Sequence, residues 1–268
     1  HYWEEPCISG AHDSESGRGS GAVFFCGCPL GCVFCQNHDI SGFSRKIEGK
    51  AVTPYQLAEI MLRLEDKGAY NINLVSPTQY TPQIRKALET VKHKIGIPVI
   101  WNTGGYELTT TVDTLEGLVD VWLPDLKYYS GELSRKYSRA PEYFRYASDA
   151  VRRMFELSGP IVFGNDEMVK SGLIIRHMVM PSQRKDSMAI IKWIADSFSS
   201  DDIRVSIMSQ YTPTGINGGY PELDRRVTSF EYNSVTALAS ELGLKGWTQD
   251  RMSVGSSFVP TFDYTGIY

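Results

Sequence analysis

Long apolar runs are missing from this sequence. None approaches the roughly 20 residues that a membrane-spanning helix requires, so we expect no membrane partner. Positive charge is not in excess either, because 27 Lys and Arg residues face 31 Asp and Glu, and a net charge of −4 argues against a nucleic-acid partner. No basic stretch followed by an apolar run opens the chain, as a secretory signal would. We therefore expect a cytoplasmic protein.

Cysteine is scarce, and its distribution argues against a disulfide framework. Five cysteines occur among 268 residues, and four of them lie between Cys26 and Cys35. Secreted disulfide scaffolds spread their cysteines along short chains, and an odd number leaves one thiol without a partner. A reducing compartment and a metal centre explain the pattern better.

Low-complexity linkers are also absent, and short apolar runs alternate with helical patterns along the chain. The runs are nearly continuous in apolar residues, as strands covered on both faces are. They cover residues 22–25, 72–75, 97–101, 119–123, 173–180 and 203–208. Amphipathic helical patterns lie between them, and the first begins with a capping box at Thr53, Pro54 and Gln56.

Strand–helix alternation predicts a parallel sheet with right-handed crossovers. About six units are present rather than the eight of a closed barrel, so we expect an α/β fold with a partial (β/α)6 TIM-like barrel in a single domain. Residues 1–246 would form this domain, with residues 1–21 as an N-terminal cover segment. Residues 247–268 show no clear period and are expected to pack on the barrel as a C-terminal tail.

Polar residues follow the six predicted strands. The carboxyl ends of parallel strands meet at one rim of the fold, where the chemistry of α/β proteins collects. The residues at these ends are Cys28, Cys32 and Cys35; Ser76, Pro77 and Thr78; Asn102 and Thr103; Asp125 and Lys127; Arg176; and Gln210 and Tyr211. Together they predict a pocket for a polar, zwitterionic ligand beside a metal.

The spacing Cys28-x3-Cys32-x2-Cys35 lets one short loop wrap three corners of a 4Fe–4S cluster, which usually takes four cysteine ligands. A fourth iron without a protein thiolate would be an open coordination site. The alternative is a structural zinc ion held by Cys26 and these three cysteines. Zinc ligands usually come as two separated pairs, whereas here a single loop supplies all four. The spacing therefore favours the cluster.

The cysteine motif, with Phe34 directly before its last cysteine, resembles the signature of the radical S-adenosylmethionine (SAM) superfamily. Within it, the chain is most similar to the pyruvate formate-lyase activating enzymes and their uncharacterised relatives. The similarity is carried by residues 4–10, 17–37, 75–84, 122–133 and 172–181. It implies a partial (β/α)6 barrel that binds a 4Fe–4S cluster through the three cysteines of the motif and SAM at the open iron.

The resemblance also implies a reaction. Electron transfer from the reduced cluster would break a C–S bond of SAM and release a 5′-deoxyadenosyl radical, which abstracts a hydrogen atom from the substrate. The implied partner is a glycyl radical enzyme, and the implied electron donor is a flavodoxin or ferredoxin. Two alternatives stay open. One is a radical SAM enzyme that acts directly on a small molecule or peptide, and the other is a non-catalytic zinc or iron–sulfur electron-transfer protein.

Roles for individual residues follow from the same resemblance. Phe34 would lie near the adenine and Asn37 near the cluster loop. In the activating enzymes, the residues that match Asn102, Thr103 and Asp125 surround the SAM carboxylate together with a monovalent cation.

Lys127 would add positive charge near the SAM carboxylate, and Arg176 and Tyr211 would contact the ribose and the adenine.

The chain departs from the family at two positions. Residues 76–78 replace the Gly-Gly-Glu motif that usually binds the SAM amine, so the carboxylate of that motif is missing. Asn102 stands where the activating enzymes carry an Asp.

Overall fold

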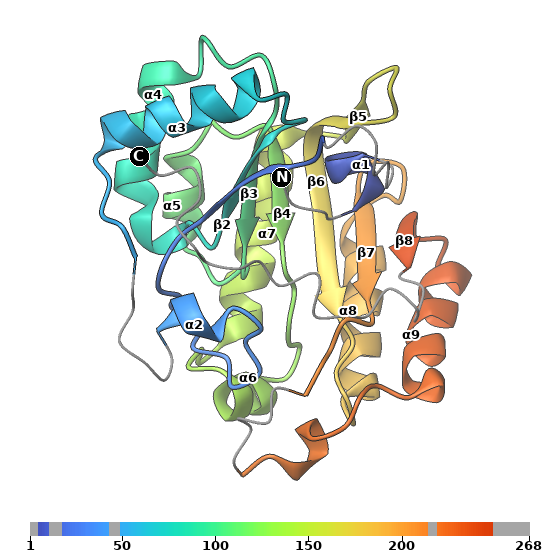
Figure 1. Cartoon of the computed structure of the whole chain (residues 1–268). Helices are drawn as coiled ribbons and strands as arrows, with labels where there is room; N and C mark the ends of the chain where they lie inside the picture. Colours follow the sequence, from blue (N-terminus) through green and yellow to red (C-terminus); the bar gives the residue numbers. More distant parts are fainter. Residues whose placement is uncertain (1–4, 11–17, 43–48, 214–218, 249–268) are drawn as a thin grey trace.

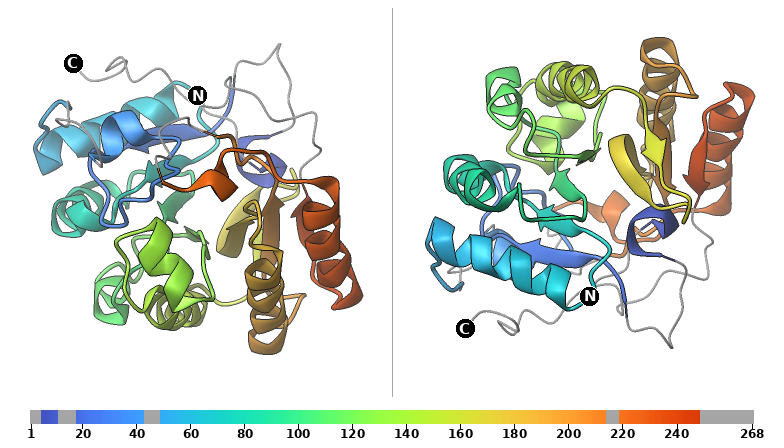
Figure 2. Two further views of the ribbon diagram at one scale, coloured as in Figure 1. Left: turned by 90° about the horizontal axis from the view of Figure 1, so that it is seen from below. Right: turned by 90° about the horizontal axis from the view of Figure 1, so that it is seen from above.

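Parallel strands form the central sheet of the computed structural model, which describes residues 5–10, 18–42, 49–213 and 219–248. In spatial order they are β1 (Gly21–Phe24), β2 (Ile72–Val75), β3 (Val99–Thr103), β4 (Val121–Pro124), β6 (Val169–Met178), β7 (Arg204–Met208) and β8 (Gly246–Thr248). A short β5 (Val162–Phe163) pairs antiparallel with β6. Within the described part of the chain β1 and β8 do not pair with each other, so the sheet is an open, partial barrel (Figure 2).

Helices cover the outer face of this sheet (Figures 1 and 2). The longer ones are α3 (Pro54–Asp66), α4 (Thr81–Val91), α7 (Tyr143–Ser158), α8 (Arg184–Ser197) and α9 (Ser229–Glu241). The shorter elements are α1 (Pro6–Ser9), α2 (His38–Ser41), α5 (Thr109–Asp113) and α6 (Gly131–Tyr137), with the 3₁₀ turns η1 (Thr78–Tyr80) and η2 (Pro221–Leu223). None of the described helices combines the length and the apolar composition that crossing a membrane requires.

The capping box predicted at the start of α3 is present. The Thr53 hydroxyl accepts a hydrogen bond from the backbone N–H of Gln56 at 3.3 Å, and the Gln56 side chain accepts one from the backbone N–H of Thr53 at 2.9 Å. Two donors that a helix start leaves without partners are satisfied in this way. The helix therefore begins where the sequence predicts.

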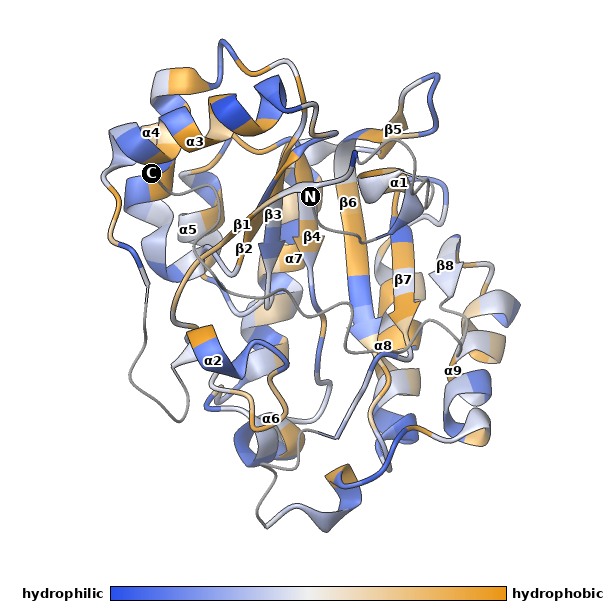
Figure 3. Ribbon diagram, viewed as in Figure 1, coloured by the Kyte–Doolittle hydropathy of each residue, from blue (hydrophilic) through white to orange (hydrophobic). Residues whose placement is uncertain are grey.

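Alternate side chains of the strands belong to two apolar clusters. Those that face outward pack with the helices, and examples are Leu74, Trp101 and Ile175. Those that face inward pack with α1, and examples are Ile100, Leu123 and Ile174. Figure 3 shows the strands as mostly apolar, with hydrophilic residues toward the C-terminal end of β6. The apolar lumen therefore gives way to a polar rim.

The N-terminal helix α1 closes the end of the barrel at which the strands begin (Figure 1). Asn71, just before β2, donates a side-chain N–H to the carbonyl of Ile8 at 2.6 Å. Ser20 donates its hydroxyl to Asn71 at 2.6 Å. The cysteine loop (residues 26–37) lies at the end of the barrel where the strands end. The described part of residues 1–21 thus covers the opposite end, where the strands begin.

At the other terminus, β8 extends the sheet by one strand beyond the six that the sequence predicts. It pairs in parallel with β7, so the predicted boundary at residue 246 falls inside a strand. The rest of the predicted tail, residues 249–268, lies outside the described residues.

Replacing Ile8 by Ala should lower the free energy of unfolding by about 2–5 kcal/mol, because Ile8 is fully buried and a cavity would remain between α1 and the strands. Chemical denaturation followed by circular dichroism measures the change. Leu108→Ala is the control, since Leu108 is 56% exposed and should lose less than about 0.5 kcal/mol. Equal losses in both variants would contradict a stabilising role for α1.

Candidate functional site

The cysteine loop follows β1 and is tied to the end of β2. Gln79, on η1, donates side-chain N–H groups to the carbonyl oxygens of Cys26 at 3.1 Å and Gly27 at 2.7 Å. The same nitrogen lies 2.8 Å from the carbonyl oxygen of Ser76. Gly27 has φ +81°, in the left-handed region that favours glycine. The start of the loop is therefore fixed by its neighbour strand as well as by its own backbone.

The middle of the loop is paired with the connection between α6 and α7. The backbone N–H of Val33 donates to the carbonyl of Tyr137 at 2.9 Å, and the N–H of Arg139 donates to the carbonyl of Leu30 at 2.6 Å. These bonds join segments that are about a hundred residues apart in the sequence. The loop is thus held from two sides of the barrel.

The thiols of Cys28, Cys32 and Cys35 lie near one another in the loop. Burial raises the pKa of the Cys32 thiol to about 12, and Cys28 and Cys35 add to the rise. Burial also raises the pKa of Cys35, again with a contribution from Cys28. Burial raises the pKa of Cys26 as well. The three thiols of the predicted cluster motif thus lie close enough to influence one another's ionisation.

This donor set fits an iron–sulfur cluster. Among the residues that the structure describes, no three His, Cys, Asp or Glu side chains converge on a point that could hold one metal ion. In a 4Fe–4S cluster each cysteine thiolate binds a different iron, so its ligands need not share one point. Lys127 also lowers the pKa of Cys32 against the effect of burial, which favours the thiolate form that binds iron.

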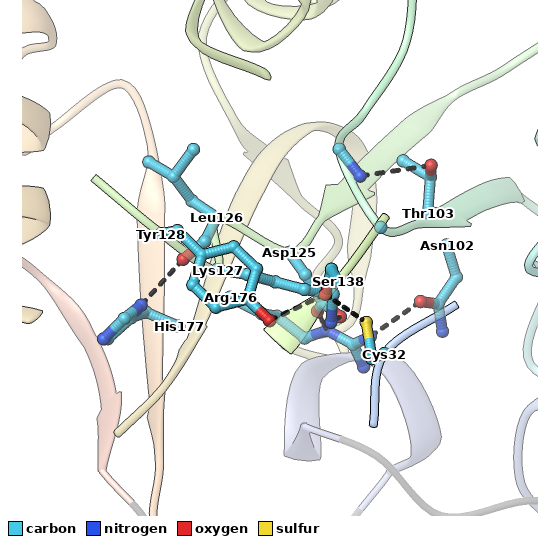
Figure 4. Close-up of polar contacts among 12 residues, drawn as sticks. Cys32, Asn102, Thr103, Asp125, Leu126, Lys127, Tyr128, Ser138, Arg176 and His177 are labelled. Carbon is cyan, nitrogen blue, oxygen red and sulfur yellow. Dashed lines mark hydrogen bonds and ion pairs between the residues drawn. The ribbon is translucent and has the colours of Figure 1, made fainter. Parts of the chain in front are cut away.

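A network of half-buried charged side chains lies beside the cysteine loop at the ends of β3, β4 and β6 (Figure 4). Arg176 donates to Asp125 Oδ1 at 2.9 Å and to Asn102 Oδ1 at 2.7 Å. Lys127 donates to Asp125 Oδ2 at 2.6 Å. Burial would raise the pKa of Asp125, but the two cations outweigh it and hold the pKa below its usual value. The two cations, Lys127 and Arg176, outnumber the one carboxylate of Asp125, so a net positive charge remains. This charge suits an anionic group of a ligand.

A second polar group lies at the ends of β2 and β3 and is organised by Glu107, which no sequence pattern marks. Its Oε1 accepts hydrogen bonds from Thr78 at 2.7 Å, from Thr103 at 2.5 Å and from the indole N–H of Trp101 at 3.0 Å. Burial raises the pKa of Glu107, although these bonds act against the rise. The two threonine hydroxyls also lie 3.1 Å from each other, and each oxygen can accept a hydrogen bond from a further group.

A small pocket connects these threonines with the cysteine loop. Its walls include Cys28, Ser76, Thr78, Gln79 and Thr103. Gln79 also has a buried Oε1 with no hydrogen-bond partner among the described residues. The pocket is therefore rich in acceptors, which suits an ammonium group of a ligand.

The aromatic residues predicted near the adenine are packed against each other. Phe34 is 4% exposed and meets Tyr128 and Tyr211 edge to face, with ring centroids 6.5 and 6.2 Å apart. Tyr211 is 1% exposed and donates its hydroxyl to the carbonyl of Leu223 at 2.7 Å. Both rings thus belong to the core beneath the rim, and their contact with the adenine stays a prediction.

The remaining predicted residues lie at the same end of the barrel. Asn37 precedes α2, and its backbone N–H bonds to the Cys35 thiol. The carbonyl of Gln210 accepts a hydrogen bond from Gln36 at 2.9 Å, and Pro77 is buried where η1 begins. The structure therefore brings the predicted residues to one end of the barrel, where most of the polar ones form two groups beside the loop and Phe34 and Tyr211 lie in the core beneath.

Comparison with known proteins relates this rim to a family. A model of the radical SAM superfamily matches residues 22–193. An uncharacterized protein of Methanocaldococcus jannaschii is 34% identical over 232 residues, which cover 84% of this chain and 63% of that protein. The chain therefore spans less than two thirds of the length of this relative.

Solved structures share the fold at low sequence identity. SuiB of Streptococcus suis, solved with its precursor peptide SuiA, has a TM-score of 0.59 and 13% identity over 85% of this chain and 48% of SuiB. A radical SAM methyltransferase of Sphaerobacter thermophilus has a TM-score of 0.59 and 13% identity over 90% of this chain and 68% of its own. Because the family model matches the chain from β1 through the cysteine loop to α8, this protein belongs to the radical SAM superfamily.

Proposed function

We propose that this chain is a radical SAM enzyme that binds a 4Fe–4S cluster through Cys28, Cys32 and Cys35 and holds SAM beside it. When bound, the two cofactors supply a 5′-deoxyadenosyl radical by reductive cleavage of SAM, and this radical abstracts a hydrogen atom from the substrate. The observation that carries the proposal is a loop with three closely spaced cysteines that adjoins both a pocket with several hydrogen-bond acceptors and a positively charged network.

The two polar groups match the two charged ends of the methionyl part of SAM. The network around Lys127 and Arg176 suits its carboxylate, and the pocket around Thr78 and Thr103 suits its ammonium group. Glu107 then compensates for the missing carboxylate of the Gly-Gly-Glu motif. It acts through the two threonines, whose hydrogens it accepts, rather than by touching the amine.

In this proposal Arg176 supplies the positive charge that a bound cation supplies in the activating enzymes. The resemblance to the activating enzymes places a monovalent cation near Asn102 and Asp125. In this chain the Arg176 guanidinium bonds to both side chains. A fixed guanidinium supplies positive charge at that position, so the SAM carboxylate needs no metal ion there.

Within this class we propose a protein substrate, with a glycyl radical enzyme as partner and a flavodoxin or ferredoxin as electron donor. The similarity to the activating enzymes in residues 17–37 and 122–133 supports this choice. The replaced motif at residues 76–78 supports a second candidate, an enzyme that acts directly on a small molecule or peptide. A glycyl radical signal in electron paramagnetic resonance (EPR) spectra of a partner separates the two candidates.

Protein reconstituted without oxygen should bind about four iron atoms per chain and, once reduced, form 5′-deoxyadenosine from SAM. Cys32→Ala should abolish SAM cleavage, because one iron loses its thiolate ligand. Iron analysis, EPR spectra and chromatography of the nucleoside measure these outcomes.

Cys26→Ala is the matched control, because Cys26 lies in the same loop but outside the Cys28-x3-Cys32-x2-Cys35 motif. It should keep the iron content and the SAM cleavage of the parent. A colourless protein with one zinc ion per chain, lost in Cys26→Ala, would contradict the proposal. So would a cluster that is indifferent to SAM, which would indicate a plain electron carrier.

SAM affinity should be the same in sodium, potassium or bulky organic cation buffers, since Arg176 supplies the positive charge. Arg176→Met should weaken SAM binding roughly 10- to 100-fold, as expected for the loss of about 1.5–3 kcal/mol from a hydrogen bond to a charged group. Calorimetric titration of the reconstituted protein measures both effects. Arg204→Met is the control, because Arg204 bonds to backbone carbonyls where β7 begins. A strict requirement of the parent for potassium would contradict the role given to Arg176.

A further inference from the structure

A serine that is distant in the sequence donates a hydrogen bond to one of the cysteines of the motif. The hydroxyl of Ser138, at the end of α6, lies 3.0 Å from the sulfur of Cys32, which precedes it by 106 residues. The hydroxyl of Tyr128 lies 2.7 Å from the Ser138 hydroxyl (Figure 4). All three side chains are buried, with Ser138 at 3% and Tyr128 at 1% exposure.

The backbone fixes this contact from both sides. The bond from Val33 to Tyr137 and the bond from Arg139 to Leu30 bracket the serine and the cysteine. Val33, Tyr137 and Arg139 are direct neighbours of Cys32 or Ser138, and Leu30 lies two residues before Cys32. Ser138 is therefore held opposite Cys32 by the fold, independently of the hydrogen bond between their side chains.

The direction of the hydrogen bonds follows from the number of hydrogens. An iron-bound cysteine is a thiolate and can only accept, so Ser138 gives its single hydrogen to the sulfur of Cys32. The Ser138 oxygen then accepts from Tyr128. Burial raises the pKa of Tyr128 well above its usual value, so its phenol keeps the proton that it donates. Tyr128 therefore donates to Ser138, and Ser138 donates to the sulfur of Cys32.

We propose that Ser138, supported by Tyr128, raises the reduction potential of the cluster by donating to its Cys32 ligand. This inference rests on the proposed function, because it needs the cluster. Reduction adds negative charge that is shared with the ligand sulfurs, and hydrogen bonds to these sulfurs are among the factors that set the potential. The hydrogen bond from Ser138 to Cys32 is stronger because it is buried. The hydrogen bond that Ser138 accepts from Tyr128 polarises the Ser138 hydroxyl and strengthens it further.

Ser138 is a positioning and tuning residue that touches a ligand of the cluster. Cys35 has a donor of its own in the backbone N–H of Asn37, which variants at Ser138 or Tyr128 leave in place. The effect of these variants therefore reports on the bond to Cys32.

The test is an EPR-monitored redox titration of the reconstituted protein without SAM. Ser138→Ala should shift the midpoint potential to a more negative value, and Tyr128→Phe should shift it in the same direction by less. Ser138→Thr keeps the hydroxyl and should titrate close to the parent. Ser148→Ala is the matched control, because Ser148 is a buried serine of α7 whose hydroxyl bonds to the carbonyl of Arg145. It should leave the potential unchanged.

A parent-like potential in Ser138→Ala, at parent-like iron content, would overturn the proposal. If Ser138→Ala assembles no cluster, Tyr128→Phe decides, and a parent-like potential in that variant overturns the proposal as well. Formation of 5′-deoxyadenosine by the parent tests the proposed function separately. A parent that holds a cluster but never cleaves SAM would refute that function and leave the potential measurement valid, whereas a parent that binds no iron would overturn both.

Discussion

A half-buried carboxylate just after β4 depends on two cations for its charge. Asp125 contacts Lys127, two residues away, and Arg176 on β6, while Arg176 also bonds Asn102 on β3. Removing one partner of this network would leave another charge without compensation in a site that water only partly reaches. These contacts therefore join the ends of β3, β4 and β6. They also fix the rim of the barrel that carries both polar groups of the site.

Much of the fold could be predicted because its signals are local. Six strands lie at or within a few residues of the predicted apolar runs, since strands buried on both faces are apolar throughout. The capping box at Thr53 likewise depends on neighbouring residues alone. Helix α7 was not predicted although Ala147, Val151 and Met154 repeat at helical spacing. Strand β8 was missed because three residues are too few to show a period.

The candidate site divides in the same way. Parallel strands bring their carboxyl ends to one rim, so the positions of Asn102, Asp125 and Lys127 could be predicted from where apolar runs end. Their partners could not, because hydrogen bonds across the fold leave no spacing pattern. Glu107 follows β3 as one acidic residue in a loop, and nothing in the sequence indicates that it meets Thr78. The ion pair between Asp125 and Arg176 also needed the registration of β4 with β6.

The position of α1 has a consequence for how the chain reaches its native state. Ile8 is among the first described residues, yet it packs against Val169 and Ile174, which lie far along the chain. Contacts between distant segments form slowly, because a large loop must close first. During synthesis on the ribosome α1 therefore emerges long before the strands that it packs against. Its apolar side chains are among the last of the described core to be sheltered from water, since β6 must leave the exit tunnel first.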